Sequence, residues 1–218
     1  MKRVVFFIFV FSLIFAAQAH AYDDHDFQIW NTDVEEMKIN DKWKVSTEQE
    51  FRWGDNASQL FYQHYDMGAF YSFSKWLNVG GGYRHVLLKS KGKYLVENEP
   101  YIHVTLTGEI AGFKLESRNR FEYDHFDYQS DYGRYRNKMT MRFPWKFTAL
   151  EIQPFVADEV FLCYTKSNAF NQNRFFAGLA LTATKNIKGE LYYMLQSYKS
   201  GETWFDANVF GTKLKIGF

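Results

Sequence analysis

The sequence is poor in cysteine and proline, and positive and negative charges are nearly balanced. A single cysteine, Cys163, among 218 residues excludes an intrachain disulfide and any metal site built from several thiolates. Three prolines and 14 glycines exclude the collagen-like and low-complexity disordered classes. Lysine and arginine total 26 against 25 aspartate and glutamate, so no basic surplus indicates nucleic acid as a partner. We also find no motif for a cofactor, a metal or a catalytic centre.

The N-terminus contains the only long apolar run, and its features are those of a secretory leader. Lys2 and Arg3 precede the run at residues 4–15, and Ala19-His20-Ala21 has the small residues of a cleavage site. The run is shorter than the roughly 20 residues that a spanning helix needs. We predict a cleaved signal peptide at residues 1–21 and one domain at residues 22–218.

From Phe27 onward, apolar and charged residues alternate with period two, which predicts β-strands. The pattern is clearest over residues 112–125, where one face carries only charges, and it recurs over residues 132–143. Such a face must be wet or internally paired. The charged positions are Lys114, Glu116, Arg118, Arg120, Glu122 and Asp124, followed by Arg134, Arg136, Lys138 and Arg142, with Glu97, Glu99 and His103 on the preceding segment.

The spacing of turn residues predicts ten strands between residues 42 and 218, with one further β-like segment at residues 27–38. Short connections alternate with longer polar ones, such as 89–94 and 199–203, as is typical of an up-and-down transmembrane barrel. Bacterial single-chain barrels have even strand numbers. The segment 27–38 is therefore expected inside or beside a ten-stranded barrel, unless a missed strand makes twelve. The predicted fold is an all-β, antiparallel up-and-down transmembrane β-barrel of 10–12 strands.

Aromatic residues favour lipid outside this barrel. Tryptophans gather at the predicted strand ends, as the interface girdles of membrane barrels require. The final strand has an apolar face that ends in an aromatic residue, like the signal read by the outer-membrane barrel-assembly machinery. We predict the outer membrane as the location, with its lipid and the assembly machinery as partners. The girdle residues are Trp43, Trp53, Trp76, Trp145 and Trp204, and the assembly signal is Phe210, Leu214, Ile216 and Phe218.

Two segments resemble a known family. They are Asn40-Asp41-Lys42-Trp43 through Glu48-Gln49-Glu50-Phe51-Arg52, and Lys75-Trp76-Leu77-Asn78-Val79-Gly80-Gly81-Gly82-Tyr83-Arg84. Both are similar to an uncharacterised bacterial family catalogued as a domain of unknown function of the 2490 type. The resemblance implies an outer-membrane β-barrel and no catalytic residues.

Three functions remain open from the residues. The first is a structural barrel with a charged, mostly filled lumen or a narrow channel for small solutes or ions, which Arg118, Arg120, Arg134 and Arg136 would make anion-selective. The second is an outer-membrane hydrolase of lipid or peptide, in which His103 would be the base and Thr105 the nucleophile. The third is a soluble periplasmic ligand-binding barrel.

Two local clusters receive structural interpretations. Asp124, His125, Asp127 and Asp131 could suggest a protease or a cation site, but Asp124 and His125 point to opposite faces, so we expect a solvated loop cluster. The run Gly80-Gly81-Gly82 could suggest a phosphate-binding loop, but no helix follows it, so we expect close packing instead.

Overall fold

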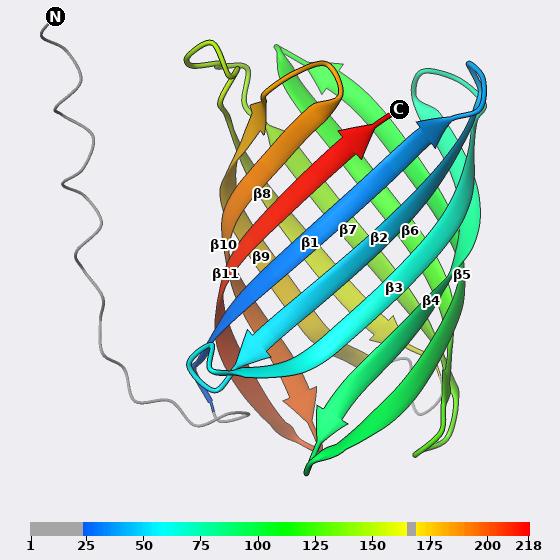
Figure 1. The fold of residues 1–218 in the computed structure, drawn as a ribbon, viewed down its shortest axis with the longest axis vertical. Helices are drawn as coiled ribbons and strands as arrows, with labels where there is room; N and C mark the ends of the chain where they lie inside the picture. The colour runs from blue at the N-terminus through cyan, green and yellow to red at the C-terminus, as the bar shows by residue number, and fades with distance from the viewer. Residues whose placement is uncertain (1–23, 165–168) are drawn as a thin grey trace, which may run out of the picture.

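The computed structural model describes residues 24–164 and 169–218, which form a closed all-β barrel (Figure 1). The predicted signal peptide lies outside the described residues. Within them no helix is long and apolar enough to cross a membrane. The strands are β1 (Asp26–Lys38), β2 (Trp43–Gly54), β3 (Gln59–Ser72), β4 (Leu77–Ser90), β5 (Lys93–Ile110), β6 (Phe113–Phe126), β7 (Tyr132–Arg142), β8 (Gln153–Cys163), β9 (Ala169–Thr182), β10 (Ile187–Ser200) and β11 (Thr203–Gly217).

Eleven strands close the barrel, with one parallel pair among antiparallel ones. Each strand pairs with its sequence neighbour in antiparallel register, whereas β1 pairs with β11 in parallel register, from Asp26↔Ala207 to Glu36↔Gly217. The predicted all-β barrel of 10–12 strands is thus confirmed. The expectation of an even number was wrong: the segment 27–38 lies in the wall as β1, neither inside nor beside it, because a parallel pair can close an odd number of strands.

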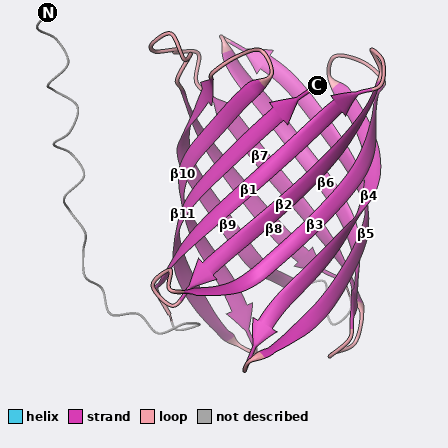
Figure 2. Ribbon diagram, in the orientation of Figure 1, coloured by secondary structure: helices cyan, strands magenta, loops and turns pink. Residues whose placement is uncertain are grey.

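The connections differ from the predicted alternation of short and long. The expected longer loop at 89–94 is a tight hairpin, since Lys91 and Gly92 have φ values of 49° and 78°. Two successive residues with positive φ match the right-handed twist of paired strands. The longest connection between described strands is instead 143–152, which lies at the same end of the barrel as the C-terminus (Figure 2).

Glycines make room for aromatic rings inside the barrel. A Cβ atom on Gly80 would lie 2.3 Å from the Phe70 ring, and one on Gly211 would lie 2.0 Å from the Tyr192 ring. Strand glycine often marks such a close approach. The run Gly80-Gly81-Gly82 lies within β4, where Gly80 and Gly82 face the rings of Phe70 and Tyr101.

The outer wall is rich in exposed apolar side chains. Because the side-chain direction alternates along each strand, the charged half of each alternating segment turns inward and the apolar half turns outward. Strongly exposed examples lie on five different strands and are 49–62% exposed: Met67, Ile102, Phe121, Phe175 and Tyr193. Contiguous exposed apolar surface on this scale indicates a membrane or a protein partner.

Candidate functional site

The most prominent chemical feature is a network of ion pairs inside the barrel. The structure places the charged faces of β5, β6 and β7 in the lumen, where several carboxylates and guanidinium groups are almost inaccessible to solvent. Relative exposures are 3% for Glu99, 5% for Arg120, 4% for Glu122, 0% for Asp124 and 8% for Arg136. Charges buried this deeply must be paired, and here they are.

Glu122 lies at the centre of this network. Its carboxylate is 2.6 Å from Arg120 Nε, 2.6 Å from Arg134 Nε and 3.0 Å from Arg136 Nη1. Period two on β6 and β7 places the four residues on the inner face, and the antiparallel register sets Glu122 opposite Arg134 and Arg120 opposite Arg136. One carboxylate thus contacts three arginines, two of which also pair with other acids: Arg134 with Glu99 and Asp124, and Arg136 with Glu159.

Arg134 fills the position that a cation would take beside the buried acids. The carboxylates of Glu99, Glu122 and Asp124 could together hold a metal ion. The guanidinium of Arg134 already contacts all three, at 2.9, 2.6 and 3.2 Å respectively. The cluster is therefore a set of arginine acceptors rather than an open cation site.

Several members of the network lie outside the charged runs recognised in the sequence. Asp66 on β3 lies 3.0 Å from Arg84 Nε and accepts a hydrogen bond from the Tyr101 hydroxyl at 2.6 Å. Glu159 on β8 lies 2.7 Å from Arg118 and 3.1 Å from Arg136. On β8 the other inward residues carry no charge, so period two alone does not distinguish Glu159 as one of a charged set.

Aromatic rings cover the guanidinium groups and fill the remaining volume. Arg52 lies 3.7 Å from the ring centroids of both Trp30 and Tyr62, and Arg120 lies 3.6 Å from that of Tyr101. Guanidinium groups stack well on aromatic faces. An apolar cluster fills another part of the lumen and consists of Trp30, Phe155, Ala157, Phe176, Tyr192, Met194 and Val209.

Within the described part of the chain, the lumen is divided into separate cavities. One cavity, of about 400 Å³, lies toward the start of β1 and includes Asp26, Trp30 and Glu97 in its lining. Two others, of about 620 and 420 Å³, lie toward the end of β11 and share Arg118, Lys213 and Lys215. The ion-pair network separates the two ends.

The predicted hydrolase pair is adjacent but incomplete. His103 Nε2 lies 2.6 Å from Thr105 Oγ1, and the Phe70 ring packs edge-on against the imidazole at 5.2 Å. Among the described residues, His103 has no carboxylate within hydrogen-bond distance. The imidazole therefore lacks the orienting group that a base acting on a hydroxyl nucleophile needs.

The acidic cluster after β6 is divided between two faces of the strand. Asp124 points inward and pairs with Arg134 at 3.2 Å, whereas the exposed His125 bonds Asp131 through Nδ1 at 2.8 Å. That hydrogen bond lowers the pKa of Asp131, which lies in the connection to β7. These contacts tie the connection between β6 and β7 to the end of β6.

The tryptophans named in the sequence lie at both ends of the barrel. Trp43, Trp76 and Trp145 are 46%, 59% and 55% exposed near the end of the barrel where β11 finishes. Trp204 is 41% exposed at the opposite end, where Trp53 is half-buried. On β11, Phe210, Leu214 and Phe218 are exposed, and Ile216 is half-buried at the parallel contact with β1.

Comparison with known proteins places the chain in a family without supplying an activity. No curated protein matches the sequence. The model of one family, described as Protein of unknown function (DUF2490), matches residues 27–206, which extend from β1 into β11 and include every residue of the ion-pair network named above. The chain therefore belongs to the DUF2490 family.

Proposed function

We propose that this protein is an outer-membrane β-barrel whose lumen is closed by buried ion pairs, so that its role is structural or ligand-binding rather than that of an open pore. The observation that carries the proposal is the contact of Arg134 with Glu99, Glu122 and Asp124 across the lumen. Side chains can fill the interior of a small barrel completely. Removing one partner from such a network would leave an uncompensated buried charge, so single substitutions in it are expected to be costly.

The membrane location is supported by the exposed apolar side chains of the wall and by the leader expected at residues 1–21. A soluble periplasmic ligand-binding barrel would instead bring its apolar residues inside and its charges to the surface. Here the largest buried charged set faces the lumen. The hydrolase alternative gains no support, because His103 has no carboxylate partner among the described residues.

Two measurements test the proposal. Membrane fractionation should place the protein in the outer membrane, and unboiled samples should migrate differently from boiled ones on gels. Purified protein in planar lipid bilayers should then produce no stable conductance steps. Recovery in the soluble periplasmic fraction would refute the membrane location, whereas steady conductance of the wild-type protein would refute the closed lumen and favour the narrow channel.

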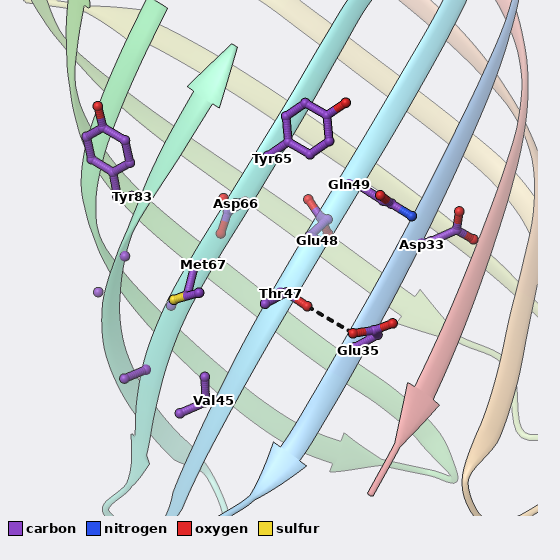
Figure 3. Close-up of a pocket in the computed structure, with 14 residues that line it drawn as sticks. Asp33, Glu35, Val45, Thr47, Glu48, Gln49, Tyr65, Asp66, Met67 and Tyr83 are labelled. Atoms are coloured by element: carbon purple, nitrogen blue, oxygen red, sulfur yellow. Dashed lines mark hydrogen bonds between the residues drawn. The ribbon is translucent and has the colours of Figure 1, made fainter.

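The outer wall offers a second test of the membrane location, because carboxylates also lie on it. Figure 3 shows Asp33 and Glu35 on β1 beside Val45, Thr47 and Met67 of the next two strands, in the lining of one pocket. Thr47 Oγ1 lies 3.5 Å from Glu35 Oε2, and Asp33 is opposite Gln49 in the ladder. An acid on a lipid-facing wall destabilises a membrane barrel.

We therefore expect the Asp33→Leu variant to unfold at higher urea concentration in lipid vesicles. The gain in unfolding free energy should be about 1 kcal/mol, since the cost of a lipid-facing acid is smaller than the roughly 2–4 kcal/mol of a lysine or arginine. Asp41→Leu, in the exposed turn after β1, is the matched control and should change little. A destabilised Asp33→Leu protein would show that this face contacts water or a polar partner instead of lipid.

A further inference from the structure

The larger cavity at the end of the barrel where β11 finishes is strongly basic. It has a volume of about 620 Å³, and its lining includes nine lysines and arginines but only three acids. The acids are Glu116, Glu151 and Glu190, and the basic residues are Lys114, Arg118, Lys138, Arg142, Lys146, Lys185, Lys188, Lys213 and Lys215. The whole chain is nearly neutral, so this concentration of positive charge is local.

Like charges lie directly opposite each other across the strands that line this cavity. Lys114 is opposite Arg142 and Arg118 is opposite Lys138 between β6 and β7. Lys188 is opposite Lys215 between β10 and β11. Like charges at directly opposed positions destabilise a sheet. Three such pairs around one cavity therefore oppose folding unless a negative charge lies between them.

The acids of the chain compensate only part of this charge. Arg142 pairs with Glu190 at 2.5 Å, and Lys213 pairs with Glu48 at 3.2 Å. Two further pairs are Arg118 with Glu159 at 2.7 Å and Lys146 with Glu151 at 2.8 Å. Lys215 shares Glu36 with Lys44, so one carboxylate offsets two ammonium groups. These contacts leave an excess of positive charge in the cavity.

Lys138 is partly buried in the lumen, and the acid opposite it in the ladder, Glu159, forms its ion pair with Arg118 instead. Its ammonium lies 3.7 Å from the ring centroid of Phe176, and no ion pair joins it to a carboxylate in the described ranges. Lys114, Lys185 and Lys188 likewise form no ion pair among the described residues. In the central network, by contrast, Glu122 lies between the opposed pair Arg120 and Arg136.

We propose that this basic cavity binds a soluble multivalent oxyanion of the phosphate class, such as an oligophosphate or a small molecule that carries one. Lysine ammonium groups on flexible stems are point charges that adapt to phosphate oxygens. A cleft lined by charges of one sign also concentrates the field and raises the local concentration of counter-ions. The site uses the end of the lumen and needs no open pore, so it goes beyond the closed-barrel function.

Binding of inorganic tripolyphosphate tests the proposal. The purified barrel in a zwitterionic detergent should bind it by calorimetry, and the heat-unfolding temperature should rise with ligand. A triple variant, Lys114→Gln, Lys138→Gln and Lys188→Gln, should bind about tenfold more weakly or worse, because each opposed pair loses one charge. The gel-shift assay would establish that the variant is folded.

A matched triple variant controls for net charge. Lys42→Gln, Lys91→Gln and Lys93→Gln removes the same charge from positions outside the cavity and should leave tripolyphosphate affinity within about twofold. Equal losses in the two variants, or no binding by the wild-type protein, would overturn the proposal. Micelles of a lysophosphatidylglycerol form a separate arm: cavity-dependent binding of that lipid alone would show that the phosphate belongs to a headgroup and would also refute a soluble ligand.

Discussion

Replacing Glu122 by glutamine is expected to lower the free energy of unfolding by about 3–5 kcal/mol, the usual cost of removing one partner from a buried ion pair. The carboxylate lies within 3.0 Å of Arg120, Arg134 and Arg136, and glutamine keeps its shape but removes its charge. The three guanidinium groups would then lose the one carboxylate that they share, in a region almost inaccessible to solvent. Urea unfolding in detergent, followed by tryptophan fluorescence, measures the change.

The charge-balanced replacement distinguishes pairing from packing. Arg120→Met combined with Glu122→Met removes one charge of each sign, and buried pairs are often replaced by apolar residues at little cost. Arg134 would keep Glu99 and Asp124, and Arg136 would keep Glu159. We expect this double variant to be more stable than Glu122→Gln alone. If the single variant is as stable as the exposed control Glu109→Gln, the carboxylate does not hold the network together.

Replacing the central side chains of the ion-pair network by small residues should open the lumen to ions. Serine at Arg120, Glu122, Arg136 and Glu159 removes two positive and two negative side chains and leaves small polar groups in their place. We expect discrete conductance steps in planar bilayers, where the wild-type protein should give none. Arg84 keeps its contact with Asp66 at 3.0 Å, so part of the lumen remains paired and the pore should be narrow.

The matched control changes charged residues that do not span the lumen. Lys42, Asp55, Lys91 and Glu109 lie in turns or at a strand end, and their replacement by serine removes the same number of charges of each sign. This variant should remain non-conducting. The network variant could fold, as judged by its gel shift on boiling, and still give no conductance steps. Other side chains would then close the barrel, and the apolar cluster around Trp30 would be the first candidate.

Much of the wall could be predicted because period two is a local signal. The alternation along β6 identifies both faces of the strand, and the structure places Glu122 inside and Phe121 outside. Glu159 escaped notice because most of the other inward residues of β8 are apolar. A single inward charge becomes meaningful only when its partners on other strands are known, as Arg136 and Arg118 are for Glu159.

Closure of the barrel could not be derived from the pattern along the strands. Alternation assigns residues to the two faces of a strand but contains no information about which strand pairs with Asp26–Lys38. A closed barrel in which every pair of strands is antiparallel must also have an even number of strands. Loop lengths were also misleading, because the polar residues around Lys91 resemble those of a longer loop. The positive φ at Lys91 and Gly92 forms instead a tight turn that polar composition does not distinguish.

The parallel contact between β1 and β11 constrains how such a wall can be completed. It joins residues 26–36 to residues 207–217, so the seam cannot form until nearly the whole domain is available. Contacts between such distant residues have the largest loop-closure cost, and parallel ladders are slightly less stable per residue than antiparallel ones. Until then β1 presents a free edge that can pair with another chain.

Because the two strands run in the same direction, the chain enters β1 at one end of the barrel and leaves β11 at the other. Insertion into a bilayer would therefore require one end of the domain to traverse it, a step that barrels built only from hairpins avoid.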